Sequence, residues 1–300
     1  MKFNTATTPS PARRKLGRPR LLIVGCGDVG QRIVARLRGR FRIYGTTRTT
    51  DGAHAVRAAG AVPLLLDLDQ ASAPRQRRIA QLATRIIVLM PTSTQGQKDA
   101  RTPRLLGSLP HRGAGRLVYM STTGVYGDRQ GRWTDETTAA APGNDRAHRR
   151  LDAERRLRAS RWRAAVLRVP GIYAADRLPL ERLRAGIPVP LPGADVYTNH
   201  IHAEDLARAC IAALFRAAPA RLYNTIDDSQ LLLGEYLDRV ADRMGLPRPR
   251  RAPWEEMRVQ AGPQRMSFLG ESRRLRNARM KRELRLRLRY PDIDAGLAAA

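Results

Sequence analysis

The first half of the chain alternates between short apolar runs and longer stretches in which apolar residues recur every three or four positions. A short apolar run is typical of a strand buried on both faces, and the longer spacing is typical of an amphipathic helix. The predicted strands are 20–25, 41–45, 62–67, 86–90 and 116–121. The predicted helices lie near 28–38, 52–59, 75–83 and 97–107. This alternation predicts an α/β fold with a doubly wound parallel sheet, which binds ligands at the carboxyl ends of its strands.

The second half of the chain contains the same elements with more interruptions. The predicted elements are the helix 144–159, the strand 164–169, a stretch rich in proline and glycine at 186–194, the helix 203–216, the strand 221–226 and the helix 231–244. The rest is predicted to be rich in loops, with a basic segment at 273–289. We predict a disordered basic arm at 1–19, a sheet domain at 20–170 and a smaller, interleaved region at 171–300 that binds substrate.

One predicted junction between strand and helix, LLIVGCGDVGQRIV at 21–34, carries three closely spaced glycines. Glycine permits a tight turn and a close approach of the backbone to a ligand, because it has no Cβ. The helix that follows points its free N–H groups and its positive end at one spot, where an anion can bind. The spacing Gly-x-Gly-x-x-Gly in this context favours a Rossmann dinucleotide site over a turn without a ligand. The residues predicted to form it are Gly25, Gly27, Asp28, Val29 and Gly30.

The end of the second predicted strand indicates which nicotinamide cofactor fits. An acidic residue there binds the ribose 2′-OH of NAD and would repel a 2′-phosphate. The chain instead reads GTTRTT, with Thr46 and Thr47 in the acidic position and Arg48 next. A guanidinium can hold a phosphate through two parallel hydrogen bonds. Thr47 and Arg48 therefore favour NADP over NAD, and a solvated arginine is the alternative interpretation of Arg48.

The chain carries a formal net charge of +28, from 55 basic and 27 acidic residues. Clustered basic side chains bind nucleic acid by releasing counterions from its phosphates. Here nearly all of the basic residues are arginines spread through every segment, and only 5% of the residues are aromatic. Because base stacking needs aromatic side chains, we favour solvated arginine-rich helix faces over a nucleic-acid surface.

Composition also bears on the compartment. The chain has no run of 18 apolar residues, so we expect no membrane-spanning segment. Its first 19 residues lack the apolar core of a secretory signal, although their basic composition leaves an organellar transit peptide open. Cys26 and Cys210 provide neither a disulfide framework nor metal-ligand spacing. We expect a cytoplasmic protein.

Several longer motifs resemble those of one protein family. They are LLLDLD at 64–69, YMSTTGVYGD at 119–128, RVPGIYAADR at 168–177, NHIHAEDLA at 199–207, YNTID at 223–227 and RNARMKRELRLRLRYPDIDAGL at 276–297. With the glycine turn, and in this order from about residue 20 to about residue 295, they resemble the extended short-chain dehydrogenase/reductase family, the NAD-dependent epimerase/dehydratase proteins.

The resemblance implies roles for particular residues. It implies that Asp67 and Leu68 lie near the adenine. It also implies that the nicotinamide-side ribose lies near Met90, Pro91 and Thr92. The catalytic hydroxyl of the family precedes the valine of its Val-Tyr-Gly piece by three residues, which is Thr122 here. A hydroxyl just past the end of a central strand faces the ligand crevice of such a fold.

The chain departs from the family at its catalytic pair. The family's Tyr-x-x-x-Lys, followed by Ala-Glu, falls on RAHRRLDAE at 146–154, so Arg146 replaces the tyrosine and Arg150 the lysine. Arginine cannot relay a proton near neutral pH, because its pKa exceeds about 12. Arg150 can still donate hydrogen bonds to a ribose. These replacements, and a glycine spacing tighter than the family's usual Gly-x-x-Gly-x-x-Gly, resemble the atypical subgroup that lacks the standard tyrosine.

Other side chains are candidates for the proton transfer. Tyr126 is the nearest phenol in the sequence, at a position that the resemblance makes usually structural. His148, His200 and His202 are the histidines considered, since histidine titrates near neutral pH. Metal binding by His200, His202 and Asp205 would need further ligands, so we expect no metal site. The candidate catalytic residues are Thr122, Tyr126, Arg146 and Arg150.

These observations favour an NADP-binding, oxidoreductase-like enzyme of the epimerase/dehydratase type, with NAD as the weaker choice of cofactor. Arginines near the predicted crevice would suit a small anionic substrate; they are Arg146, Arg150, Arg168 and Arg177. A non-catalytic NADP(H) binder or sensor is the alternative, because losing the tyrosine can abolish turnover. A basic protein associated with nucleic acid is a third interpretation. The sequence leaves the substrate and the oligomeric state open, a homodimer included.

Overall fold

Seven parallel strands form the central sheet of the computed structural model, which describes residues 17–110, 115–257 and 270–299. The strands are β1 (Arg20–Val24), β2 (Arg42–Thr47), β3 (Val62–Leu65), β4 (Arg85–Val88), β5 (Arg116–Thr122), β7 (Arg163–Val169) and β12 (Arg221–Asn224). Their order in the sheet is β12-β7-β5-β4-β1-β2-β3, and every neighbouring pair is parallel. The order reverses between β1 and β4, as in a doubly wound sheet. The predicted fold class is confirmed.

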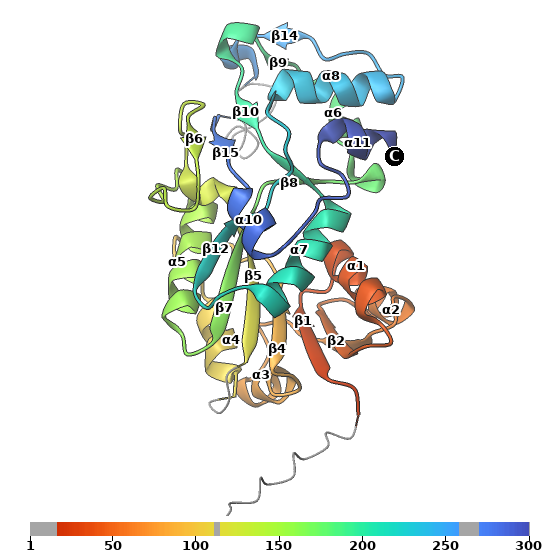
Figure 1. The fold of residues 1–300 in the computed structure, drawn as a ribbon, viewed down its shortest axis with the longest axis vertical. Helices are drawn as coiled ribbons and strands as arrows, with labels where there is room; N and C mark the ends of the chain where they lie inside the picture. Colours follow the sequence, from red (N-terminus) through yellow and green to blue (C-terminus); the bar gives the residue numbers. More distant parts are fainter. Residues whose placement is uncertain (1–16, 111–114, 258–269, 300) are drawn as a thin grey trace, which may run out of the picture.

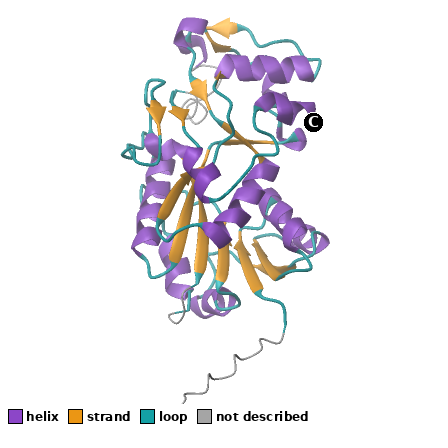
Figure 2. Ribbon diagram, in the orientation of Figure 1, coloured by secondary structure: helices purple, strands orange, loops and turns teal. Residues whose placement is uncertain are grey.

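Helices cover both faces of the sheet (Figures 1 and 2). They are α1 (Asp28–Leu37), α2 (Thr50–Ala58) and α7 (Ala203–Arg216) on one face, and α3 (Ala73–Ala80), α4 (Arg101–Ser108) and α5 (Asp145–Ala159) on the other. Alternate residues of β1 face opposite ways: Leu21 and Ile23 join the core under α1 and α7, whereas Leu22 and Val24 join the other core. Burial on both faces explains why this strand is wholly apolar.

Helix α4 begins four residues later than the predicted start at residue 97. The Asp99 carboxylate is buried and accepts hydrogen bonds from the backbone N–H groups of Arg101 and Thr102, at 3.3 and 2.9 Å. It also accepts one from the N–H of Ser93, at 2.8 Å. These bonds satisfy the free donors of the first helical turn, so Asp99 sets the start of the helix. The segment before it folds back as a loop.

A smaller lobe stands above the carboxyl ends of the strands (Figure 1). Its elements are the 3-10 turns η1 (Thr123–Tyr126), η2 (Ala175–Arg177) and η3 (Pro192–Ala194), the strands β6 (Trp133–Thr134), β8 (Gly171–Tyr173), β9 (Val189–Pro190), β10 (Tyr197–Thr198), β11 (His200–His202), β13 (Leu231–Leu232), β14 (Arg251–Ala252) and β15 (Arg274–Leu275), and the helices α6 (Leu180–Arg184), α8 (Leu233–Arg243) and α11 (Ile293–Ala298). Its own core contains Tyr173, Leu237, Val240 and Ile293. The lobe therefore has a core of its own and covers the carboxyl ends of the strands, where a doubly wound sheet binds its ligands.

The basic segment at 273–289 contains more regular structure than its composition suggests. It includes β15, which pairs with β6, and α10 (Ala278–Glu283), which lies beside β12. Met280 and Leu284 supply the apolar contacts that hold α10 on the core under α7. Residues 1–16 of the predicted arm lie outside the described residues, and the domain boundary at residue 170 stays a prediction.

Candidate functional site

The three glycines of the turn after β1 have different structural duties. Gly25 has a φ of +86°, and a Cβ on it would lie 2.7 Å from the backbone nitrogen of Met90. A Cβ on Gly30 would lie 3.0 Å from the sulfur of Cys26, so this glycine lets α1 pack closely on the sheet. A Cβ on Gly27 would meet no atom of the described residues within 4 Å. Gly27 therefore faces open space, which a close-approaching ligand requires.

Helix α1 begins directly at this open backbone. Gly27 is its N-cap, and no side chain caps the helix. The first-turn N–H groups and the positive end of the helix are thus available to an anion such as a pyrophosphate. Thr46 of β2 supports the turn from the other side, because its hydroxyl accepts a hydrogen bond from the N–H of Gly25 at 2.9 Å. These features fit a dinucleotide.

A cleft of about 370 Å³ lies beside this turn. It gathers eight of the twelve residues predicted to hold the cofactor: Gly25, Gly27, Thr47, Arg48, Asp67, Leu68, Met90 and Pro91. The other four lie outside its wall. Val29 and Gly30 belong to α1 and are buried, and Thr92 is also buried. Asp28 forms ion pairs with Arg32 and Arg177 at 2.8 and 2.7 Å. We call this cavity the cofactor cleft.

Arg48 and Arg101 bring positive charge to the wall of the cofactor cleft. Arg48 is exposed and makes no hydrogen bond within the described part of the chain. Arg101, which the sequence analysis missed, is buried and fixed: its Nη1 donates to the carbonyl oxygens of Pro91 and Thr92, and its Nη2 lies 2.5 Å from Asp69. The hydrogen bonds from Arg101 lower the pKa of Asp69. Arg48 can therefore reach a ligand, whereas Arg101 is held in place.

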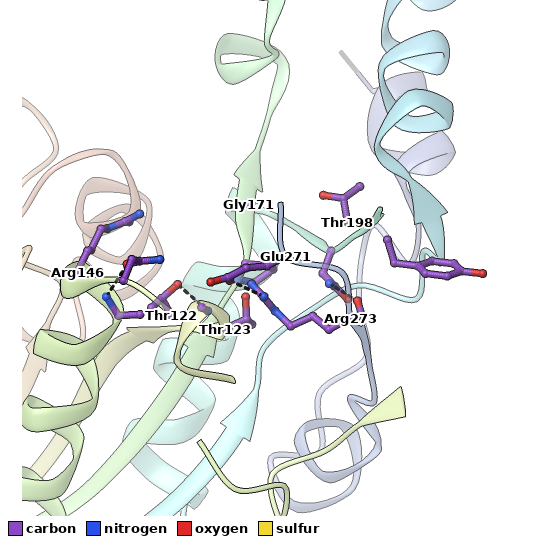
Figure 3. Close-up of a pocket in the computed structure, with 13 residues that line it drawn as sticks. Thr122, Thr123, Arg146, Gly171, Thr198, Glu271 and Arg273 are labelled. Atoms are coloured by element: carbon purple, nitrogen blue, oxygen red, sulfur yellow. Dashed lines mark hydrogen bonds and ion pairs between the residues drawn. The ribbon is translucent and has the colours of Figure 1, made fainter. Parts of the chain in front are cut away.

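A second pocket, of about 300 Å³, opens where β5 and β7 end (Figure 3). Its wall is formed by Thr122, Thr123, Gly124, Asn144, Arg146, Ala147, Pro170, Gly171, Tyr197, Thr198, Asn199, Glu271 and Arg273. Two of the predicted catalytic residues, Thr122 and Arg146, are thus brought together. Desolvation and the charges of Arg150 and Arg149 lower the pKa of Arg146. The surroundings of Arg146 on this side of the second pocket are therefore cationic.

Arg150 lies at the junction between the two cavities. Its Nη1 donates to the carbonyl oxygens of Met90 and Met120, at 3.3 and 2.8 Å, and to the hydroxyl of Tyr119 at 2.9 Å. Met90 lines the cofactor cleft, and Met120 precedes the Thr122 turn by two residues. The guanidinium is buried and joins the ends of the neighbouring strands β4 and β5. Arg150 therefore fixes the backbone on which both cavities depend.

Tyr126, predicted as a catalytic candidate, does not line the second pocket. Its side chain is fully buried, and its hydroxyl donates to the Oδ1 atom of Asn224 at 2.7 Å. The guanidinium of Arg168 lies 4.5 Å from the centre of its ring and is paired with Glu154 at 2.7 Å. Burial raises the pKa of the phenol. Tyr126 is a structural side chain because the polar groups around it are buried and mutually bonded.

The histidines also lie outside both cavities. His200 is buried against the ring of Tyr236, with centroids 3.9 Å apart, and burial lowers its pKa to about 3. The Nδ1 atom of His202 accepts the N–H of Glu204 at 3.2 Å and caps α7. His148 is half-buried on α5. The described residues contain no group of three or more His, Cys, Asp or Glu side chains that could hold a metal ion.

Sequence reasoning missed the far wall of the second pocket. Asn199, Glu271 and Arg273 reach it from segments more than 70 residues after Thr122. Glu271 and Arg273 form an ion pair at 2.7 Å. One weak signal was present, because Glu271 is an acidic residue at the start of a strongly basic segment.

Among the described residues, no helix is both long and apolar enough to cross a membrane.

No protein-family model matches the chain. A conserved protein of unknown function from Silicibacter pomeroyi DSS is 31% identical, with 94% of this chain and 97% of that chain covered and a TM-score of 0.79. A Methylobacillus flagellatus protein provisionally named an NAD-dependent epimerase/dehydratase is 25% identical, with the same coverage and a TM-score of 0.71. Protein YeeZ of Escherichia coli (strain K12) is 26% identical over 239 residues, which are 77% of this chain and 85% of YeeZ.

A more distant neighbour was solved with a cofactor. The structure of a double mutant of DesIV, a dTDP-glucose 4,6-dehydratase from Streptomyces venezuelae, contains NAD and DAU. It is 20% identical, with 93% of this chain and 95% of that chain covered, and its TM-score of 0.75 shows a shared fold. The structural neighbours are therefore NAD-dependent epimerase/dehydratase-like proteins of the extended short-chain dehydrogenase/reductase type.

Proposed function

The chain belongs to the extended short-chain dehydrogenases/reductases of the epimerase/dehydratase type. We propose that it is an oxidoreductase-like enzyme that uses a nicotinamide dinucleotide. The observation that carries this proposal is the adjacency of the cofactor cleft and the second pocket. Met90 lines the cleft and Thr122 lines the second pocket. Arg150 donates hydrogen bonds to the backbone after β4 and at the end of β5, which carry these two residues. A dinucleotide in the cleft would place its reactive end beside the pocket.

The proposed cofactor is NADP. Arg48 lines the cleft next to Thr47, at the end of β2, where an acidic side chain would serve the 2′-OH of NAD. Its guanidinium is exposed and makes no hydrogen bond to any described residue, although its charge helps to lower the pKa of Asp69 nearby. A charge-assisted contact of this kind is typically worth about 1.5–3 kcal/mol.

The proposed substrate is small and anionic. Arg146 and Arg273 line the second pocket from α5 and from the segment before β15, with Arg149 and Arg150 adding positive charge behind Arg146. Guanidinium groups bind carboxylates and phosphates through paired hydrogen bonds. The hydroxyl and amide groups of Thr122, Thr123 and Asn199 could bind hydroxyls on the same molecule.

The chain's residues divide the work between the two cavities. When bound, the dinucleotide would supply hydride chemistry. The backbone at Gly27 and the start of α1 would hold its pyrophosphate. Arg150 would hold the strand ends beside which the nicotinamide-side ribose lies, and the Thr122 hydroxyl would bind the reacting oxygen of the substrate. Arg146 would bind an anionic group but not move a proton, since an arginine stays charged.

Two steps test this proposal. NADPH and NADH are first titrated into the protein, and the fluorescence of the reduced nicotinamide is followed. The bound NADPH is then mixed with a panel of small anionic carbonyl compounds, such as 2-oxo acids and keto-sugar phosphates, and its absorbance is recorded. Tighter binding of NADPH than NADH, with consumption of NADPH by at least one compound, is the expected result. If neither NADPH nor NADH binds, the proposal is overturned.

A second function is a non-catalytic NADP(H) binder or sensor. Arg146 and Arg150 favour it, because they replace the proton-relaying pair of the family, and the buried Tyr126 does not substitute for it. Tight NADPH binding without turnover of any carbonyl compound would support this alternative.

We also propose that the protein works in the cytoplasm and binds no nucleic acid. The buried, unpaired Cys26 and Cys210 suit a reducing compartment.

A further inference from the structure

We infer that Glu271 is the group that exchanges a proton with the substrate in the second pocket. The inference rests on the proposed oxidoreductase function and adds to it the acid–base residue that the sequence analysis did not find. The family's tyrosine is replaced by Arg146, which lines the pocket but cannot titrate near neutral pH. A reaction that moves a hydride from an alcohol carbon must also move the hydroxyl proton, so some other group has to accept it.

The chemistry of the pocket wall leaves few candidates. The amides of Asn144 and Asn199 do not titrate, and threonine hydroxyls give up protons far above neutral pH. Tyr197 has a phenol, but phenols, like threonine hydroxyls, ordinarily give up their protons well above neutral pH. Its ring packs against Arg274, whose guanidinium lies 4.9 Å from the ring centre, and against Gly131. Among the described residues of the wall, Glu271 is the one that carries a carboxylate.

The carboxylate of Glu271 is held in a defined position. Its Oε2 atom lies 2.7 Å from Nη1 of Arg273, and the same Nη1 donates to the carbonyl oxygen of Gly127 at 3.0 Å. A Cβ built on Gly143 would lie 3.2 Å from Oε1, so this oxygen lies against the backbone that leads into α5. Arg273 thus acts as a positioning residue, because it anchors one carboxylate oxygen while the other remains unbonded to it.

Glu271 also lies where a substrate oxygen would be accessible. Figure 3 shows its side chain reaching over Thr122 and Thr123, with Arg146 on the opposite side of the cavity. Its side chain is 12% exposed, which shields it from bulk water but leaves a route for proton exchange. A carboxylate, a hydroxyl donor and a cation therefore converge on one small cavity beside the cofactor cleft.

The proposed step is balanced in both directions. In oxidation, the hydroxyl proton of the substrate passes to Glu271 while the hydride, with its electron pair, leaves the same carbon for the nicotinamide ring. The carbon–oxygen bond becomes a carbonyl, and Glu271 returns its proton to water. In reduction, Glu271 takes a proton from water and passes it to the carbonyl oxygen as the hydride, with its electron pair, arrives at the carbonyl carbon from the reduced nicotinamide. General acid–base catalysis of this kind typically contributes 10²–10⁴-fold to the rate.

The test compares Glu271→Gln with a matched control, Glu283→Gln. Glu283 also forms an ion pair with an arginine, Arg221, but lies in α10 outside both cavities. For each protein, the rate of NADPH consumption with the anionic carbonyl panel and the dissociation constant of NADPH are measured. We expect Glu271→Gln to lower kcat by about 10²-fold or more, with the dissociation constant of NADPH unchanged. The control should retain both values.

Chemical rescue distinguishes proton transfer from a structural role. Glu271→Ala leaves space for a small acid, so added formate should restore part of its kcat, whereas the rate of the unaltered protein should not rise. Full activity of Glu271→Gln would overturn the assignment of Glu271 while leaving the proposed function intact, and so would loss of activity together with NADPH affinity. If the unaltered protein binds NADPH but consumes none with any compound, the proposed enzymatic function fails and this assignment fails with it.

Discussion

The cofactor cleft and the second pocket lie side by side but are built differently. The cleft is assembled from consecutive strand ends, between Val24 and Arg101, so its residues follow one another along the chain. The second pocket is assembled from five separate segments, which are 122–124, 144–147, 170–171, 197–199 and 271–273. Local sequence patterns can therefore encode the cleft, whereas only the folded chain creates the pocket.

The two cavities also differ in how far they follow the family pattern. The cleft has a glycine turn in which each glycine has a recognisable structural role, and Arg48 lines it at the position where the family pattern places the acidic residue of NAD-binding members. The second pocket contains Thr122 and Arg146, at the positions that the resemblance assigns to the family's catalytic hydroxyl and tyrosine. Binding of the dinucleotide and chemistry on the substrate can thus be altered separately, and the following variants separate them.

The largest effect is expected from Gly27→Val, which fills the open space at the start of α1. The valine side chain would occupy the position of the pyrophosphate, so dinucleotide binding should be abolished. The fold should persist, because a Cβ at this position meets no atom of the described residues within 4 Å. Titration with NADPH and far-UV circular dichroism check the two expectations. Normal NADPH affinity would mean that the turn is structural only.

The next largest effect is expected from Arg48→Ala, which removes the proposed 2′-phosphate contact. Loss of one charge-assisted contact should weaken NADPH binding by about 1.5–3 kcal/mol, roughly 10- to 150-fold, and leave NADH binding unchanged. Arg57→Ala is the control, because Arg57 lies in the last turn of α2 and does not line the cleft. Equal affinities of the unaltered protein for NADPH and NADH would refute NADP selectivity.

Acid should destabilise the lobe behind the second pocket through His200. Its pKa is about 3 in the folded chain and about 6.5 in an unfolded chain. The unfolded state therefore binds the extra proton as the pH falls from 6.5 to 3, and stability decreases by up to about 1.4 kcal/mol per pH unit. Denaturant unfolding of the unaltered protein and of His200→Asn, at pH 7 and pH 5, measures the difference.

Asp227 gives the stability the opposite pH dependence, so the contribution of His200 can be measured only by comparison with His200→Asn. Burial raises its pKa to about 8, so the folded state holds this proton at neutral pH and the unfolded state does not. The stability from neutral Asp227 is complete below a pH of about 4 and is lost as the pH rises through 8. Subtracting the pH profile of His200→Asn from that of the unaltered protein isolates the histidine. Equal acid sensitivity of both proteins would contradict its role.

The smallest effect is expected from Tyr126→Phe, which removes one buried hydrogen bond to Asn224. The free energy of unfolding should fall by about 0.5–1.5 kcal/mol, because the Asn224 oxygen loses its donor. Neither NADPH affinity nor any turnover should change, since Tyr126 lines neither cavity. A large drop in kcat with unchanged stability would return Tyr126 to the catalytic candidates.

The sequence by itself determined the sheet, its helices and most of the cofactor cleft. Apolar runs such as 20–25 and the turn at Gly25–Gly30 act over a few residues, so strand burial and backbone conformation can be inferred from neighbours along the chain. The predicted start of α4 was four residues too early, because the buried Asp99 carboxylate accepts the N–H groups of the first helical turn there.

The tertiary structure alone decided the second pocket. Glu271 and Thr122 are 149 positions apart and line the same pocket because α10 packs beside β12 and β15 pairs with β6. The same packing buries Tyr126, whose hydroxyl bonds to Asn224, away from the lining of the second pocket. No local pattern encodes these contacts, because their energy comes from burial and hydrogen bonding between distant segments that meet only when the chain is folded.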